Sequence, residues 1–321
     1  MMKKLMTGLL AAMMILSLVA CGGSNTPSST PASDGGPAST QPDDAPVDDG
    51  TEPDYASMTI DELKPLLQTV TGGKLTVATS PDFAPYEFYA IDESGTPSLA
   101  GFDVALAGYV ADFLGLELEI NPIDFDGVLM ELQTKSTDLG MAGLSPDPKR
   151  MNTMDFSDIY YLGGQSFVCL QSNKDLFPDL ASTNKAEYQI GAQIGSIQAD
   201  LANTNSPDAE IVLLTKVTDI IAELLGGKMD GAYIETAVAE SYAKNYPDLC
   251  VVLDVPYDVA GSAIGVVKDN PALLAAVNLA INAALSDGSM DSFVAQANEA
   301  ASGETYEGLL DESGNIQTDV G

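Results

Sequence analysis

Histidine is absent from this chain of 321 residues. Its absence excludes the Ser-His-Asp and Cys-His arrangements of nucleophilic catalysis, and it removes the common imidazole ligands of zinc. Positive charge is also scarce, because 13 lysine and arginine residues stand against 47 aspartate and glutamate residues. A surface of this sign repels nucleic acid and anionic lipid headgroups. With no metal-ligand spacing in the chain either, we expect no nucleic-acid partner, no metal site, no cofactor and no catalytic residue.

The first twenty residues have the pattern of a signal peptide. Lys3 and Lys4 precede an apolar run over residues 5–16 that is too short to span a bilayer comfortably. The following Leu18-Val19-Ala20-Cys21-Gly22 resembles the lipobox of bacterial lipoproteins, in which the signal is cut before the cysteine and the cysteine is lipidated. We therefore expect lipidated Cys21 to anchor the protein at the extracytoplasmic face of a membrane. An ordinary signal peptide with an incidental cysteine and an uncleaved membrane anchor are the alternatives.

The other two cysteines, Cys169 and Cys250, lie in apolar, strand-like segments. Outside the cytoplasm they could pair, but nothing in their spacing requires a disulfide. We favour buried free thiols and leave the pairing open.

Composition divides the rest of the chain. Residues 21–55 are rich in Gly, Ser, Thr, Pro and Asp, and this segment of low hydrophobicity and one charge sign predicts a disordered stalk. Residues 56–73 contain a helix-capping pattern at Thr59 and Glu62, followed by Pro65, and predict a short helix. Residues 303–321 form an acidic tail.

The segment 74–302 alternates between strand and helix patterns. Strands are expected near 75–78, 116–120, 138–142, 167–170, 190–192, 231–234 and 263–267, and helices near 102–114, 128–132, 218–225 and 271–285. This alternation predicts an α/β fold of two units, each with a mainly parallel sheet flanked by helices. About 230 residues suffice for two lobes that each bury a core.

Arg150 is the one arginine of the chain. Its rigid guanidinium matches a carboxylate bidentately, which a lysine cannot do. Arg150 follows Gly143-Leu144-Ser145-Pro146, a turn after a buried strand, and ligands of open α/β sheets bind at the carboxyl ends of strands. An ordinary surface cation is the alternative interpretation.

Several segments in order resemble the polar amino-acid-binding family of ABC-transporter solute receptors. They are 74–88 (KLTVATSPDFAPYEF), 101–107 (GFDVALA), 124–132 (DFDGVLMEL), 142–150 (AGLSPDPKR) and 155–161 (DFSDIYY). The resemblance covers about 74–300 and implies a periplasmic-binding-protein fold of two lobes, which two hinge crossovers near 160–164 and 258–262 close over a solute. It places lobe 1 at 74–162 and 262–302, and lobe 2 at 163–261.

The resemblance also implies roles for individual residues. Arg150 would hold the α-carboxylate of an amino acid with Gly143, Ser145, Ser196 and Ile197, and Glu235 would hold its α-ammonium group. Phe83 and Phe125 would flank its side chain, although core packing is the alternative for both. Ser80 stands where several members of that family carry Asp, and Gln193 stands where some carry Lys. Without that Asp, a cationic side chain would lack a partner, so we expect a small neutral solute. Asp82 could replace the missing carboxylate.

These features predict a monomeric, lipid-anchored receptor that delivers an amino acid or similar zwitterion to an ABC permease and ATPase. A cleft enzyme resembling cyclohexadienyl dehydratase and a sensing module for a membrane partner are the alternatives.

Overall fold

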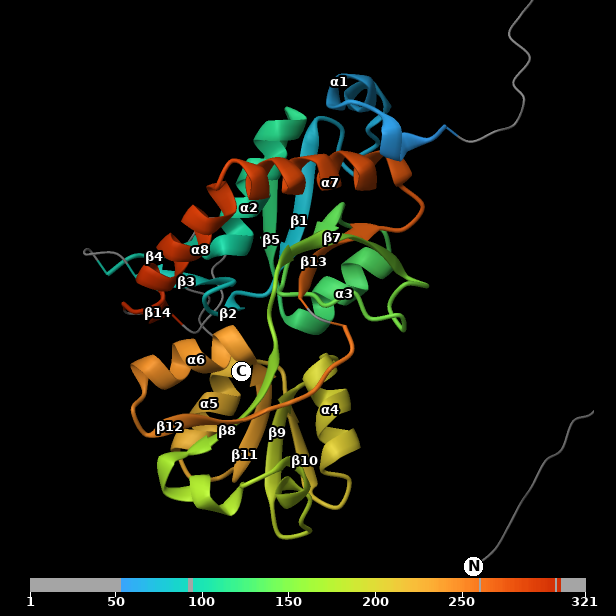
Figure 1. Ribbon diagram of the computed structural model, residues 1–321. Helices are drawn as coiled ribbons and strands as arrows, with labels where there is room; N and C mark the ends of the chain where they lie inside the picture. Colours follow the sequence, from blue (N-terminus) through green and yellow to red (C-terminus); the bar gives the residue numbers. More distant parts are fainter. Residues whose placement is uncertain (1–52, 92–94, 260, 304, 307–321) are drawn as a thin grey trace, which may run out of the picture. The chain divides into compact units, whose positions relative to one another are not determined.

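The computed structural model describes residues 53–91, 95–259, 261–303 and 305–306. The expected signal peptide, Cys21 and most of the expected stalk and tail lie outside the described residues. The described part forms one compact unit that begins at Pro53. Two five-stranded sheets organise it, and we call each sheet with its helices a lobe (Figure 1).

The lobe 1 sheet has the strand order β5-β1-β6-β13-β7. Its strands are β1 (Lys74–Thr79), β5 (Glu117–Pro122), β6 (Leu139–Gly140), β7 (Met154–Tyr161) and β13 (Ser262–Val267). The pairings β1/β5 and β1/β6 are parallel, and β13 is antiparallel to both of its neighbours. Four strands therefore run in one direction, and β13 alone opposes them.

The lobe 2 sheet repeats this arrangement in the order β10-β9-β11-β8-β12. Its strands are β8 (Gln165–Leu170), β9 (Gln189–Gln193), β10 (Glu210–Leu214), β11 (Gly231–Glu235) and β12 (Leu249–Asp254). Here β8 alone opposes the other four strands. In both lobes the reversed strand is the one that follows a crossover from the other lobe.

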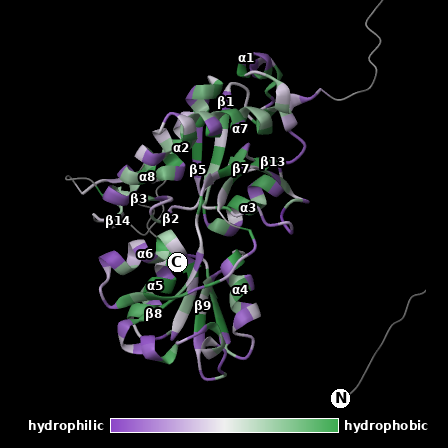
Figure 2. Cartoon of the chain, in the orientation of Figure 1, coloured by the Kyte–Doolittle hydropathy of each residue, from purple (hydrophilic) through white to green (hydrophobic). Residues whose placement is uncertain are grey.

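Helices cover both faces of each sheet. In lobe 1, α2 (Phe102–Leu114) and α7 (Pro271–Ser286) pack together over one face and α3 (Phe125–Gln133) packs against the other, while α8 (Ser289–Ala300) contacts α2 and α7. In lobe 2, α5 (Val217–Leu225) and α6 (Thr236–Asn245) cover one face and α4 (Ile197–Asn205) the other. Figure 2 shows hydrophobic residues concentrated on the strands at the centre of each lobe.

Local sequence explains the clearest of these elements. In α2, the buried side chains of Phe102, Leu106, Val110 and Leu114 recur every four residues on one helix face. The helix ends at Gly115, which adopts a left-handed conformation with φ of 74°. Apolar spacing and a glycine cap therefore set the position of this helix.

Smaller elements complete the described chain. The helix α1 (Ile60–Leu63) begins where the Thr59 amide donates to Glu62 Oε2 at 2.8 Å, and it gives way to a 3-10 turn η2 (Lys64–Leu66) that contains Pro65. A four-stranded sheet contains β2 (Asp82–Phe83), β3 (Glu87–Ile91), β4 (Pro97–Ala100) and β14 (Thr305–Tyr306). The remaining 3-10 helices are η1 (Tyr55–Ser57), η3 (Gln171–Leu176) and η4 (Leu180–Thr183). The strand β14 lies in the segment expected to be a tail.

Among the described helices, none is by itself long and apolar enough to cross a membrane. The pair α7 and α8 meets the length and composition test together, but it is bent by 77°.

Replacement by alanine should have opposite effects on stability at two glycines, Gly101 just after β4 and Gly108 within α2. A Cβ on Gly101 would lie 2.1 Å from the carbonyl oxygen of Tyr86, and its φ of 120° disfavours other residues, so Gly101→Ala should cost at least about 2 kcal/mol of unfolding free energy. Gly108 lies within α2 with open space around it, so Gly108→Ala should add about 0.5–1 kcal/mol. Urea unfolding measures both changes, and equal stability of the two variants would contradict this account.

Candidate functional site

Arg150 lies in the segment between β6 and β7 and reaches toward lobe 2. Its Nη2 donates a hydrogen bond to the carbonyl oxygen of Gly195 at 3.2 Å, and its guanidinium carbon lies 5.6 Å from the centre of the Phe125 ring. Partial burial lowers the pKa of the guanidinium, and among the described residues no carboxylate lies within ion-pair distance of it. A desolvated cation without an anionic partner is suited to binding an anionic group from a ligand.

The turn from β9 into α4 faces this guanidinium. Ser196 caps α4, since its Oγ accepts from the Ala199 amide at 3.2 Å, and Ile197 is the first residue of that helix. The Ser196 amide donates to the Gln193 carbonyl oxygen at 3.3 Å. Helix N-termini carry partial positive charge and bind anions, so α4 and Arg150 present the same sign to the space between them.

On the lobe 1 side, Ser145 and Gly143 lie in the segment that follows β6. Ser145 is buried, with 6% of its surface exposed. The amide of Gly143 already donates to Asp103 Oδ2 at 3.1 Å. A Cβ on Gly143 would lie 2.7 Å from the Phe83 ring, so the glycine lets the backbone approach that aromatic side chain. The Gly143 amide is therefore engaged inside lobe 1.

Asp82 forms a buried bridge between the lobes, a role for which the sequence carries no local signal. Its Oδ1 accepts from Ser80 Oγ at 2.8 Å, while Oδ2 accepts from Gln193 Nε2 at 3.1 Å and from the Val217 amide at 2.6 Å. Burial raises the pKa of Asp82 to about 6. Ser80 and Gln193, the two positions expected to differ from relatives, thus share one carboxylate.

Glu235 ends β11 and is almost fully buried, with 3% of its surface exposed. Its Oε2 accepts from the Val238 amide at 3.0 Å and so caps α6, while its Oε1 accepts from the Tyr86 hydroxyl of lobe 1 at 3.1 Å. Burial raises the pKa of Glu235 to about 7. This carboxyl group is poised between its neutral and ionised forms near neutral pH.

Tyr86 connects Glu235 to the hinge and to the aromatic side chains, a role that sequence reasoning missed although Tyr86 lies within the 74–88 motif. Its hydroxyl also accepts from Ser262 Oγ at 3.2 Å, and its ring lies 5.4 Å from that of Phe83. A Cβ on Gly163 would come within 2.5 Å of Glu235 Oε1, so this crossover position accommodates only glycine without rearrangement.

Direct contacts join the lobes near Arg150 as well. Lys149 Nζ lies 2.6 Å from Asp200 Oδ2, and the Tyr257 hydroxyl donates to Asp147 Oδ2 at 3.2 Å. Together with the bonds of Asp82 and Tyr86, these contacts hold the lobes against each other. Arg150 and Glu235 do not bond to each other. In the described part of the chain, Arg150 donates to Gly195, whereas Glu235 accepts from Tyr86 and Val238.

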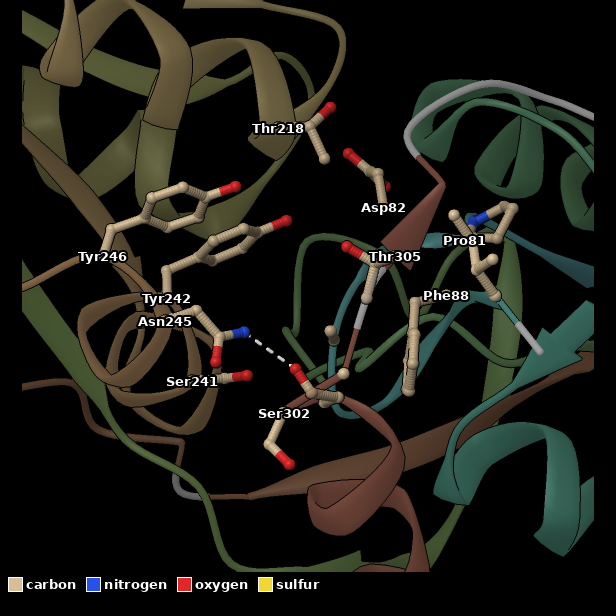
Figure 3. Close-up of a pocket in the computed structure, with 14 residues that line it drawn as sticks. Pro81, Asp82, Phe88, Thr218, Ser241, Tyr242, Asn245, Tyr246, Ser302 and Thr305 are labelled. Carbon is tan, nitrogen blue, oxygen red and sulfur yellow. Dashed lines mark hydrogen bonds between the residues drawn. The ribbon is translucent and has the colours of Figure 1, made fainter. Parts of the chain in front are cut away.

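A cavity of about 580 Å³ has Asp82 in its wall, and Arg150 does not line it. Figure 3 shows Asp82 and Thr218 on one part of its wall, with Tyr242 and Tyr246 facing Phe88 and Thr305 across it. Within the described residues, no group of three or more Cys, Asp or Glu side chains is arranged to hold a metal ion.

Comparison with known proteins identifies the family. The model of bacterial extracellular solute-binding proteins, family 3, matches residues 75–297. The chain belongs to this family. The sequence-based recognition and the two-lobed fold class are thereby confirmed.

Individual members of family 3 and their solved structures agree with this assignment. The chain is 34% identical over 206 residues to an arginine-binding extracellular protein of Bacillus subtilis, covering 61% of this chain and 75% of that protein. It is 27% identical over 198 residues to cyclohexadienyl dehydratase of Pseudomonas aeruginosa, covering 61% and 72%. An amino-acid ABC-transporter substrate-binding protein of Streptococcus pneumoniae bound to L-arginine superimposes with a TM-score of 0.69 at 31% identity, covering 72% and 97%.

Removing the Tyr86 hydroxyl should raise the pKa of Glu235 above about 7, because the hydrogen bond at 3.1 Å favours the ionised carboxylate. Tyr86→Phe keeps the ring that packs 4.3 Å from Phe102. A carbon-detected NMR titration of the Glu235 carboxyl group measures the change. Tyr109→Phe, which removes a hydroxyl bonded to the distant Asp287, is the control and should leave that titration unaltered.

Proposed function

We propose that this protein is an extracytoplasmic receptor that binds an amino acid between its lobes and delivers it to the permease and ATPase of an ABC importer. The observation that carries the proposal is the Arg150 guanidinium, which is partly buried and has no carboxylate partner among the described residues. The names of the relatives, which include an arginine-binding protein, support an amino acid as the ligand. Anchoring through lipidated Cys21 and a monomeric state belong to the same proposal.

The ligand would be held by groups of both lobes. Arg150 and the Ser145 hydroxyl, with Gly143 beside them, would bind the α-carboxylate from lobe 1, and the N-terminus of α4 at Ser196 and Ile197 would bind it from lobe 2. Glu235 would bind the α-ammonium group, which favours the ionised carboxylate. Phe83 and Phe125 would pack against the ligand side chain. Such a ligand bridges the lobes and stabilises their closed arrangement, because it binds that arrangement more tightly than a separated one.

The amino acid that binds could have a cationic or a small neutral side chain. The expectation of a small neutral solute depends on Ser80, which lacks the charge that a cationic side chain needs. The Asp82 carboxylate lies 2.8 Å from Ser80 Oγ and supplies that charge. We therefore put forward arginine as the first candidate and a small neutral amino acid as its rival.

Replacing Arg150 tests the binding of the carboxylate. Arg150→Ala should weaken amino-acid binding by at least about 2 kcal/mol, or roughly thirtyfold, because the ligand carboxylate loses its charged partner. Lys149→Ala is the matched control, since it removes a neighbouring cation whose exposed ion pair with Asp200 should matter less than about fivefold. Isothermal titration calorimetry measures both, and equal losses in the two variants would refute the assigned site.

Replacing Asp82 tests the choice of side chain. Asp82→Asn should weaken arginine binding about tenfold or more, because a charge-assisted hydrogen bond is lost, while the affinity for serine or alanine changes little. An equal loss for both ligands would mean that Asp82 acts through lobe closure and not on the solute. Tightest binding of a neutral amino acid to the unaltered protein would restore the original expectation.

A cleft enzyme is the second candidate. Burial raises the pKa of Glu235 to about 7, which suits a general acid at neutral pH, and one relative is named cyclohexadienyl dehydratase. Turnover of prephenate or arogenate that disappears in Glu235→Gln would favour this candidate over the receptor.

A further inference from the structure

Cys169 and Cys250 face each other across two neighbouring strands of lobe 2. The residues are direct partners in the antiparallel pairing of β8 and β12, and their free Sγ atoms lie 3.8 Å apart. Directly opposed residues of an antiparallel pair have Cα separations of about 4.5–5.5 Å, within the range of about 4.4–6.8 Å that a disulfide spans. A bond between the sulfurs therefore needs side-chain rotation but no displacement of the backbone.

The two thiols differ in their access to solvent. Cys169 is fully buried in an apolar cluster with Phe167, Phe177 and Ile190, and burial raises the pKa of its thiol. Cys250 is partly exposed, and its strand β12 lies at the edge of the sheet. An oxidant from solution would thus meet Cys250 first, with Cys169 behind it as the second thiol.

We propose that Cys169 and Cys250 are a site of oxidative modification and form a disulfide within lobe 2. The oxidant is a small-molecule disulfide such as oxidised glutathione. Cys250 loses its proton and attacks one sulfur of that disulfide, which releases one glutathione thiolate and leaves a mixed disulfide on Cys250. Cys169 then loses its proton, attacks the Cys250 sulfur and releases the second glutathione thiolate. Two protein thiols are oxidised, and the two glutathione thiolates take up the two protons.

The bond would close a loop between positions 81 residues apart, which contains α4, α5 and α6. It joins β8, which follows the first crossover, to β12, which precedes the second. Gln165, not Cys169, lies opposite Glu235 in the strand pairing, and four residues of strand correspond to about 13 Å. The disulfide would therefore stabilise lobe 2 at a distance from the candidate site.

The test uses the full chain incubated with oxidised glutathione and then digested without reductant. Mass spectrometry should find one peptide pair joined through Cys169 and Cys250, which separates on reduction. The unfolding temperature of the oxidised protein should exceed that of the reduced protein by roughly 5–10 °C, because the closed loop restricts the unfolded chain.

Cys250→Ser is the control and should show one unfolding temperature with or without the oxidant. Peptide mapping of the unaltered chain decides the question even if this variant folds poorly. Three outcomes would each overturn the proposal. Cys169 and Cys250 could remain free thiols after incubation with oxidised glutathione, each could carry a separate glutathione adduct, or either could form a disulfide with Cys21.

Discussion

One buried carboxylate accepts hydrogen bonds from both lobes and so ties them together. Asp82 of lobe 1 accepts hydrogen bonds from Ser80 in its own lobe and from Gln193 and the Val217 amide of lobe 2. A buried charge is costly unless hydrogen bonds satisfy it, and two of the three donors are available only while the lobes remain together. Burial raises the pKa of Asp82 to about 6. Protonation of this carboxyl group therefore contributes stability that is fully present below the ordinary pKa of aspartate and is lost as the pH rises through about 6.

Tyr86 performs a comparable task beside the hinge. Its hydroxyl links Glu235 of lobe 2 to Ser262, where the chain returns to lobe 1, and its ring packs between Phe83 and Phe102. The tight approach at Gly163 and the positive φ of Gly261, 90°, show that both crossovers need glycine. Both glycines make room for neighbouring atoms, and Gly261 also adopts a left-handed backbone conformation.

The sequence predicted the parts of the structure that depend on local patterns. Apolar spacing located α2 and α7, and short apolar runs located β1, β11 and β13 to within a few residues. The helix α6 was missed because, among its ten residues, only Val238 and Ala239 are buried, so its apolar periodicity is weak.

In the candidate site, too, some features could be predicted from sequence and others could not. Glu235 is the last residue of the buried strand β11, and Arg150 lies in the segment after β6, so their position beyond the carboxyl ends of strands could be expected from sequence. The bonds from Asp82 to Gln193 and Val217 join residues 111 and 135 positions apart across two lobes, which no local pattern encodes. The same is true of the Gly143 amide, which donates to Asp103, 40 positions earlier in the chain.

The reversed strand β13 has a consequence for how the chain is assembled. It lies between β6 and β7 in the lobe 1 sheet, yet it comes after every strand of lobe 2 in the sequence. During synthesis, lobe 1 emerges first but lacks an interior strand, whereas all five strands of lobe 2 emerge as one uninterrupted stretch. The exposed edges of β6 and β7 must wait for β13, so the earlier lobe is the later one to complete its sheet.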